Sequence, residues 1–137
     1  MTPEALAALH ARAFTVQRPW SSAEFADLLD SAFVFAVGSD AAFAMGRVIA
    51  DEAELLTLAT DPQHQRRGLG RMMLDAYHAQ AAERGATRSF LEVAADNFGA
   101  IALYESAGYK SDGRRPGYYH MQNGARVDAV LMSRALP

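Results

Sequence analysis

Cysteine is absent from this sequence of 137 residues. Its absence excludes disulfide bonds, a thiol nucleophile and cysteine-based zinc sites. Such a chain depends on its hydrophobic core, and a domain of this length buries roughly two thirds of the surface of its unfolded chain. We therefore expect residues 1–137 to form one domain that needs no cross-link to fold.

The sequence also has only a small excess of one charge sign and no long apolar run. Lys and Arg number 13 and Asp and Glu 16, a net charge of −3, which argues against the broad positive field that direct nucleic-acid binding needs. No apolar run approaches the roughly 20 residues that cross a bilayer, and residues 1–10 lack the basic and apolar stretches of a signal peptide. We expect a cytoplasmic protein with no nucleic-acid or membrane partner.

The histidines show no spacing typical of a metal site. None lies four residues from another histidine or from a carboxylate, so we expect no metal ion. The four are His10, His64, His78 and His120.

The periodicity of the apolar residues predicts an α/β protein with an α+β mixed sheet. Three successive strands joined by short turns indicate an antiparallel meander, and the helix after them indicates a parallel β-α-β crossover, with helices on both faces of the sheet. Ser21 and Glu24 predict a capping box at the start of the second helix. The expected helices are residues 3–14, 22–31, 69–82 and 97–107, and the expected strands are 33–37, 43–49, 54–59, 89–94, one beginning at 109, and 126–133, with 114–119 as a loop.

The most informative segment is residues 65–71, Gln-Arg-Arg-Gly-Leu-Gly-Arg, between a strand and the longest helix. Its glycines let the backbone approach a ligand closely, and the N–H groups of a first helical turn have no intrahelical partners. Together with three arginines they suit a pyrophosphate; the alternative is a glycine-containing turn with solvated arginines. The segment is not a P-loop, because no Gly-Lys-Ser/Thr follows, and it lacks the third glycine of a dinucleotide fingerprint.

Further motifs lie before and after this segment. They are Leu58-Ala59-Thr60-Asp61-Pro62, Leu91-Glu92-Val93, Asn97, residues 100–105 (Ala-Ile-Ala-Leu-Tyr-Glu) and Gly108-Tyr109. In this order they resemble the GNAT superfamily of N-acetyltransferases over essentially the whole chain. Within that superfamily the sequence resembles the RimI type, the ribosomal-protein-alanine N-acetyltransferases, through a smaller set: Leu91-Glu92-Val93, Asn97, Tyr104, Tyr118-Tyr119 and Asp128-Ala129.

The resemblance implies a role for each matching residue, with acetyl-CoA as co-substrate. Glu92 would act as general base and Tyr104 as general acid, while Asn97 would hold the cofactor arm. The pantetheine arm and thioester would lie along the backbone of Leu58, Ala59 and Thr60, and the pyrophosphate would lie on Arg66, Arg67, Gly68, Leu69, Gly70 and Arg71.

A purely structural role is the alternative for each of the three side chains Glu92, Tyr104 and Asn97. Asn97 and Tyr104 are seven residues apart and therefore share a helix face, but Asn97 also suits a helix N-cap and Tyr104 a core position. Glu92 could be a solvated carboxylate on the polar face of a strand. As an acid, an unperturbed tyrosine with a pKa near 10 would protonate a thiolate near 8.5 at a cost of roughly 2 kcal/mol.

Large aromatic residues on predicted loops are the candidates for binding the acceptor, namely Trp20, Tyr118 and Tyr119; the alternative is a lid that packs on the sheet. An α-amino group with a pKa near 8 is partly neutral at pH 7, unlike a lysine near 10.4, so the N-terminus of a protein or peptide is the easier substrate. Without cysteine to carry an acyl group, transfer would be direct, in a ternary complex. A small-molecule amine as acceptor, or a non-catalytic acetyl-CoA sensor, are the alternative functions.

Overall fold

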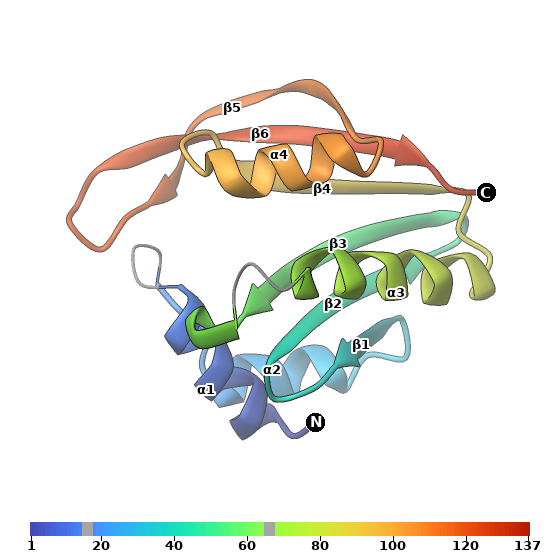
Figure 1. The fold of residues 1–137 in the computed structure, drawn as a ribbon, viewed down its shortest axis with the longest axis horizontal. Coiled ribbons are helices and arrows are strands. Elements are labelled where there is room, and N and C mark those ends of the chain that lie inside the picture. The colour runs from blue at the N-terminus through green and yellow to red at the C-terminus, as the bar shows by residue number, and fades with distance from the viewer. Residues whose placement is uncertain (15–17, 65–67) are drawn as a thin grey trace.

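The computed structural model describes residues 1–14, 18–64 and 68–137, which form a six-stranded mixed sheet with α-helices on both faces (Figure 1). Each expected helix and strand is present, with boundaries that differ by a few residues. The elements are α1 (Pro3–Ala13), α2 (Ser22–Leu29), β1 (Val34–Gly38), β2 (Ala42–Ile49), β3 (Glu52–Thr60), a short 3₁₀ helix (Pro62–His64), α3 (Leu69–Glu83), β4 (Arg88–Ala94), α4 (Phe98–Ser106), β5 (Lys110–His120) and β6 (Arg126–Ala135).

The strands lie in the order β1-β2-β3-β4-β6-β5. Strands β3 and β4 are parallel and joined through α3, while the other neighbouring pairs are antiparallel. The predicted meander and the predicted crossover are both confirmed. The capping box is confirmed too, since the Ser21 hydroxyl accepts from the Glu24 N–H (3.2 Å) and the Glu24 carboxylate accepts from the Ser21 N–H (3.1 Å).

The expectation of a loop at residues 114–119 is wrong, because this segment belongs to β5. The register with β6 shifts between Arg115 and Tyr119, so the strand absorbs Pro116 and Gly117 as an irregularity instead of ending there. Gly117 takes a positive φ of 57°, and its N–H donates to the carboxylate of Asp128 at 2.9 Å. These two features hold the irregular part of β5 against β6.

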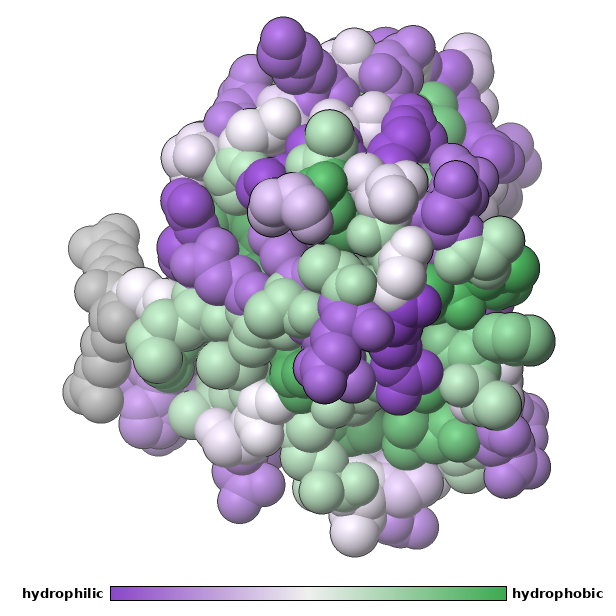
Figure 2. Space-filling model, turned by 90° about the vertical axis from the view of Figure 1, so that its right-hand side faces the viewer, coloured by the Kyte–Doolittle hydropathy of each residue, from purple (hydrophilic) through white to green (hydrophobic). Residues whose placement is uncertain are grey.

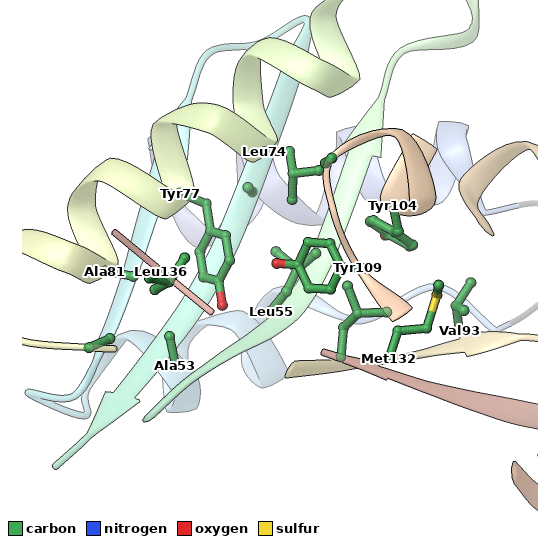
Figure 3. Packing of buried hydrophobic residues seen from close by; sticks show 14 of the residues in the cluster. Ala53, Leu55, Leu74, Tyr77, Ala81, Val93, Tyr104, Tyr109, Met132 and Leu136 are labelled. Carbon is green, nitrogen blue, oxygen red and sulfur yellow. The ribbon is translucent and has the colours of Figure 1, made fainter. Parts of the chain in front are cut away.

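Two hydrophobic cores lie on opposite faces of the sheet. Helices α3 and α4 cover one face, where Leu74 and Tyr77 pack with strand residues such as Leu55 (Figure 3). Helices α1 and α2 cover the other, where Leu9 and Phe25 pack on inward-facing residues of β1 to β3. Each core removes apolar surface from water, so both clamp helices onto the sheet.

A bulge in β3 changes which face of the sheet its side chains occupy. Met45 of β2 pairs with Thr57, but the next residue, Gly46, pairs with Leu55, so Leu56 has no residue opposite it. Because side chains alternate along a strand, the extra residue inverts the pattern. Leu55 therefore packs in the core under α3, whereas Thr57 faces α1, where its hydroxyl contacts His10.

A chain of buried hydrogen bonds lies where β3 and β4 are still paired. The hydroxyl of Ser89, opposite Ala53 in the register, lies 2.7 Å from the hydroxyl of Tyr77 and 2.7 Å from that of Tyr109. The Tyr109 hydroxyl in turn lies 2.7 Å from Nε2 of His78. Burial lowers the pKa of His78 to about 4, so its ring is neutral at pH 7. Tyr77 and Tyr109 are shown in Figure 3.

The end of the molecule near the C-terminus carries interspersed hydrophilic and hydrophobic side chains (Figure 2). Hydrophilic residues predominate in its upper part. Of the helices that the structure describes, none is both long enough and apolar enough to cross a membrane.

Candidate active site

A cleft of about 990 Å³ opens where β3 and β4 separate. In the described residues the two strands are in register only over Glu52–Glu54 of β3, paired with residues 88–90 of β4. Figure 1 shows them diverging beyond this point, away from the end that carries the C-terminus. The cleft is lined by residues 55–60 and 91–94 of the two strands, by the first turn of α3, by one face of α4 as far as Tyr104, and by α1, Trp20, Tyr119 and Met121.

The two strand edges that border the cleft present backbone amides. The Asp61 N–H donates to the Ala41 carbonyl, on the β2 side, so the backbone groups of Leu58 and Thr60 point the opposite way, into the cleft. By the same alternation, the bond from the Ala95 N–H to the Asp128 carbonyl directs the backbone of Glu92 into the cleft from β4. An extended ligand between the strands can therefore pair with amides on both sides.

The structure places Leu58, Ala59 and Thr60 on the cleft, but not in equivalent ways. Leu58 and Thr60 offer backbone groups, whereas the backbone of Ala59 faces β2 and its side chain is buried in the core beneath α1 and α2. Of the predicted trio, two are therefore disposed to bind a ligand directly.

The N-terminus of α3 forms one end of the cleft. Its N-cap, Gly68, has a φ of 74° and supplies no side-chain cap. The N–H groups of Leu69, Gly70 and Arg71 are therefore without intrahelical partners, and they lie at the positive end of the helix dipole. A Cβ atom on Gly70 would lie 3.4 Å from Leu103, so this approach is narrow. The arrangement suits an anion such as a pyrophosphate.

The three predicted arginines differ in what the structure shows. The Arg71 guanidinium bonds to Asp75 (3.1 Å) and reaches Ser106 of α4 (3.5 Å), so it links the two helices that flank the cleft. Arg66 and Arg67 lie outside the described residues.

Asn97 begins α4 and lines the cleft. Its side-chain oxygen accepts from the Ala100 N–H at 3.2 Å, which confirms the N-cap alternative. The side-chain amide donates no hydrogen bond within the described residues, so it remains available to a ligand. The structural and the binding roles of this residue are compatible.

Glu92 and Tyr104 reach the cleft from opposite faces of the sheet. Leu91 and Val93 belong to the core beneath α3 and α4, so Glu92 between them projects to the other face. Its side chain is 19% exposed, and its carboxylate forms an ion pair with Arg115 at 3.2 Å. A proton acceptor thus lies on the face that α1 covers.

Tyr104 lies on α4, packs edge-on against Tyr109 and is 7% exposed (Figure 3). Within the described residues its hydroxyl makes no hydrogen bond. Burial raises the pKa of this hydroxyl above its ordinary value, with smaller effects from Tyr109 and Tyr119. The group therefore stays protonated throughout the neutral range, and it gives up its proton at a higher cost than an unperturbed tyrosine.

Two of the three predicted acceptor residues meet at the cleft. Trp20 follows α1 in the chain, and its backbone N–H donates to Nδ1 of His10 at 3.0 Å. Tyr119 approaches from β5, where burial, followed by the charge of Glu92, raises its pKa to about 12. Tyr118 is 47% exposed outside the cleft, with the Arg115 guanidinium 5.3 Å from its ring centre.

Comparison with known proteins now identifies the family. Residues 4–109 match the sequence profile of the acetyltransferase (GNAT) family. The chain belongs to this family. The [Ribosomal protein bS18]-alanine N-acetyltransferase of Escherichia coli K12 is 42% identical to this chain over 123 residues. The matched segment covers 87% of this chain and 81% of the relative.

Solved structures support the same assignment. The crystal structure of the ribosomal-protein-S18-alanine N-acetyltransferase from Escherichia coli superposes on this chain with a TM-score of 0.87 at 36% identity. The superposition covers 98% of this chain and 87% of the Escherichia coli chain. Arabidopsis thaliana NAA60, solved in complex with acetyl-CoA, shares the fold, with a TM-score of 0.82 at 17% identity and coverage of 99% and 96%.

Sequence reasoning missed two residues around the acetyltransferase site. His10 is buried and stacked between Phe14 (4.1 Å) and Trp20 (5.1 Å), with Nε2 3.1 Å from the Thr57 hydroxyl. Burial lowers its pKa to about 4. Because Nδ1 accepts from Trp20, the proton lies on Nε2. The second is Arg115, which pairs in register with Ala129 of β6 and forms the ion pair with Glu92, a long-range contact that no local pattern of the sequence specifies.

Proposed function

We propose that this N-acetyltransferase carries the acetyl group of acetyl-CoA to the N-terminal α-amino group of a protein or peptide. An alanine-starting ribosomal protein is the specific acceptor, the 137 residues act as one domain, and the setting is the cytoplasm. The Escherichia coli relatives, whose names specify an alanine of a ribosomal protein, support this acceptor. One observation carries the proposal: Glu92 and Tyr104 enter one cleft from opposite faces of the sheet.

The residues around the cleft fit acetyl-CoA, which supplies the acetyl thioester. The N–H groups of Leu69, Gly70 and Arg71, which have no partners within the helix, would take its pyrophosphate. The backbone of Leu58 and Thr60 and the amide of Asn97 would hold the arm by hydrogen bonds, so that the arm occupies the opening between β3 and β4. The described part of the chain thus provides donors at both ends of the cleft.

Glu92 would take one proton from the acceptor nitrogen as the new C–N bond forms. Tyr104 would donate its proton to the sulfur as the C–S bond breaks, which restores a neutral thiol. The acceptor would enter on the α1 side, between Trp20 and Tyr119, and the thiol would leave on the α4 side. The two proton transfers are thereby kept apart, and no covalent acyl-enzyme is needed.

The acceptor class is tested by comparing kcat/KM for a hexapeptide that begins with alanine, for alanine amide and for a polyamine. We expect the peptide to exceed both small amines by at least about tenfold, because Trp20 and Tyr119 offer contacts beyond the amine. A tenfold advantage for a small amine would replace this proposal with a small-molecule acetyltransferase. Tyr119→Phe should raise KM for the peptide and leave acetyl-CoA binding unchanged.

A further inference from the structure

The ion pair between Glu92 and Arg115 is not needed to explain the fold. Nη2 of Arg115 lies 3.2 Å from Oε1 of Glu92, and the Arg115 side chain is 54% exposed whereas that of Glu92 is 19% exposed. Exposed ion pairs contribute little to stability. This pair, however, joins an exposed cation to a carboxylate that lines the cleft.

The register of the strands places Arg115 near Glu92, because Arg115 pairs with Ala129 of β6, which pairs with Ala94 of β4, two residues from Glu92. Asp128 of β6 accepts the Gly117 N–H at 2.9 Å, two residues after Arg115. The neighbouring Arg114 turns instead to Asp128, 3.1 Å away. Two adjacent arginines therefore have different partners, and only one of them touches the candidate base.

The ion pair involves only one of the two carboxylate oxygens of Glu92. Arg115 approaches one oxygen, Oε1, and within the described residues Glu92 has no other hydrogen bond or ion pair. Oε2 is thus the oxygen left for an acceptor, while the guanidinium restricts rotation of the side chain. The other charged or titratable groups on residues 114–120 of β5 and the paired residues 126–130 of β6 are Arg114, Tyr118, Tyr119, His120, Arg126 and Asp128.

We propose that Arg115 is a positioning and specificity residue: it fixes the carboxylate of Glu92 and, by its positive charge, makes the site select a neutral amine over an ammonium ion. This inference rests on the proposed N-terminal acetylation and deepens it. A bare carboxylate would attract the protonated, unreactive form of any amine. With a guanidinium beside it that attraction is offset, which favours α-amino groups over the more basic lysine side chain.

The decisive variants are Arg115→Gln, which removes the charge, and Arg115→Lys, which keeps it. Arg114→Gln is the matched control, because it removes the same charge from the neighbouring residue, whose ion pair with Asp128 is solvent-exposed. For an alanine-starting peptide we expect Arg115→Gln to lower kcat by about tenfold while KM for acetyl-CoA stays within about twofold. Arg115→Lys should recover most of kcat, and Arg114→Gln should match the unmodified protein.

A second measurement does not depend on turnover. A peptide whose N-terminal nitrogen is trimethylated carries a fixed positive charge, and calorimetry gives its Kd for the acetyl-CoA-loaded protein. We expect Arg115→Gln to bind this peptide at least about fivefold more tightly than Arg114→Gln does. Equal Kd values, or equal kcat values, for the two variants would overturn the role of Arg115. Absence of peptide acetylation by the unmodified protein would instead refute the proposed function, and the calorimetry would still decide on Arg115.

Discussion

Replacing Tyr104 by phenylalanine separates catalysis from packing. The ring is 7% exposed and packs edge-on against Tyr109, and phenylalanine keeps that contact. Because the Tyr104 hydroxyl has no hydrogen-bond partner among the described residues, its removal orphans no buried group. We therefore expect the free energy of unfolding to change by less than about 0.5 kcal/mol. If the hydroxyl protonates the leaving sulfur, kcat should fall by roughly 10- to 10³-fold, or about 1.4–4 kcal/mol in the activation free energy.

Tyr109→Phe is the matched control, and the opposite result is expected for it. Its hydroxyl lies 2.7 Å from both the Ser89 hydroxyl and Nε2 of His78, and all three groups are buried. Removing the hydroxyl deprives those groups of a partner, which costs about 1–3 kcal/mol. In a chain of this size that corresponds to a Tm lower by about 3–12 °C. The proton donor is untouched, so kcat at 25 °C should change far less than in Tyr104→Phe.

The assay is thermal unfolding of each variant together with kcat for an alanine-starting peptide at saturating acetyl-CoA. Tyr104→Phe should lose activity and keep its Tm, and Tyr109→Phe should lose Tm and keep its activity. If Tyr104→Phe turned over as fast as the unmodified protein, Tyr104 would be a core residue and the proposed acid would have to be another group.

Four further outcomes are expected. Glu92→Gln should lower kcat by about 10²-fold or more with acetyl-CoA affinity within a few-fold, and unchanged turnover would rule out the base. Gly70→Glu, which adds bulk 3.4 Å from Leu103 and a negative charge at the start of α3, should abolish the rise in Tm that millimolar acetyl-CoA produces. Burial lowers the pKa values of His10 and His78 to about 4, so the unfolded chain binds more protons than the folded chain between pH 6.5 and 4. The free energy of unfolding, measured in urea, should therefore be highest above pH 6.5 and fall by up to about 3 kcal/mol per histidine as the pH drops to 4. A free energy of unfolding that does not change over this range would contradict the prediction. Ala50 has a φ of 55°, so Ala50→Gly should increase the free energy of unfolding by about 1 kcal/mol and raise the Tm accordingly. A lower Tm would show that the turn is unstrained.

Local patterns were sufficient to predict most of the fold. Ser21 and Glu24 satisfy each other's backbone, so they fix the start of α2 without tertiary help. The alternation in the meander and the helix before β4 likewise determine strand direction. The loop expected at residues 114–119 failed because Pro116-Gly117 indicates a turn locally, whereas the bond from Gly117 to Asp128 is a long-range contact that keeps the segment in the sheet.

Only those parts of the site that depend on local sequence order could be predicted from the sequence. Gly68 caps α3 and Gly70 lies in its first turn, and Glu92 alternates with apolar neighbours on a strand, so their places could be inferred from order alone. The bulge at Leu56 could not, since it depends on the register of β3 against β2. The ion pair of Arg115 with Glu92 joins strands that are separated by a helix, and no local pattern specifies it.

In the proposed reaction, the cleft between β3 and β4 delivers an acetyl group to an α-amine. The most direct measurement uses one peptide that begins with alanine and also contains a single lysine, incubated with acetyl-CoA and the protein. Fragmentation in the mass spectrometer locates the acetyl group. We expect acetylation of the N-terminal nitrogen, and its loss in Glu92→Gln; acetylation of the lysine, or of neither nitrogen, would refute this role of the cleft.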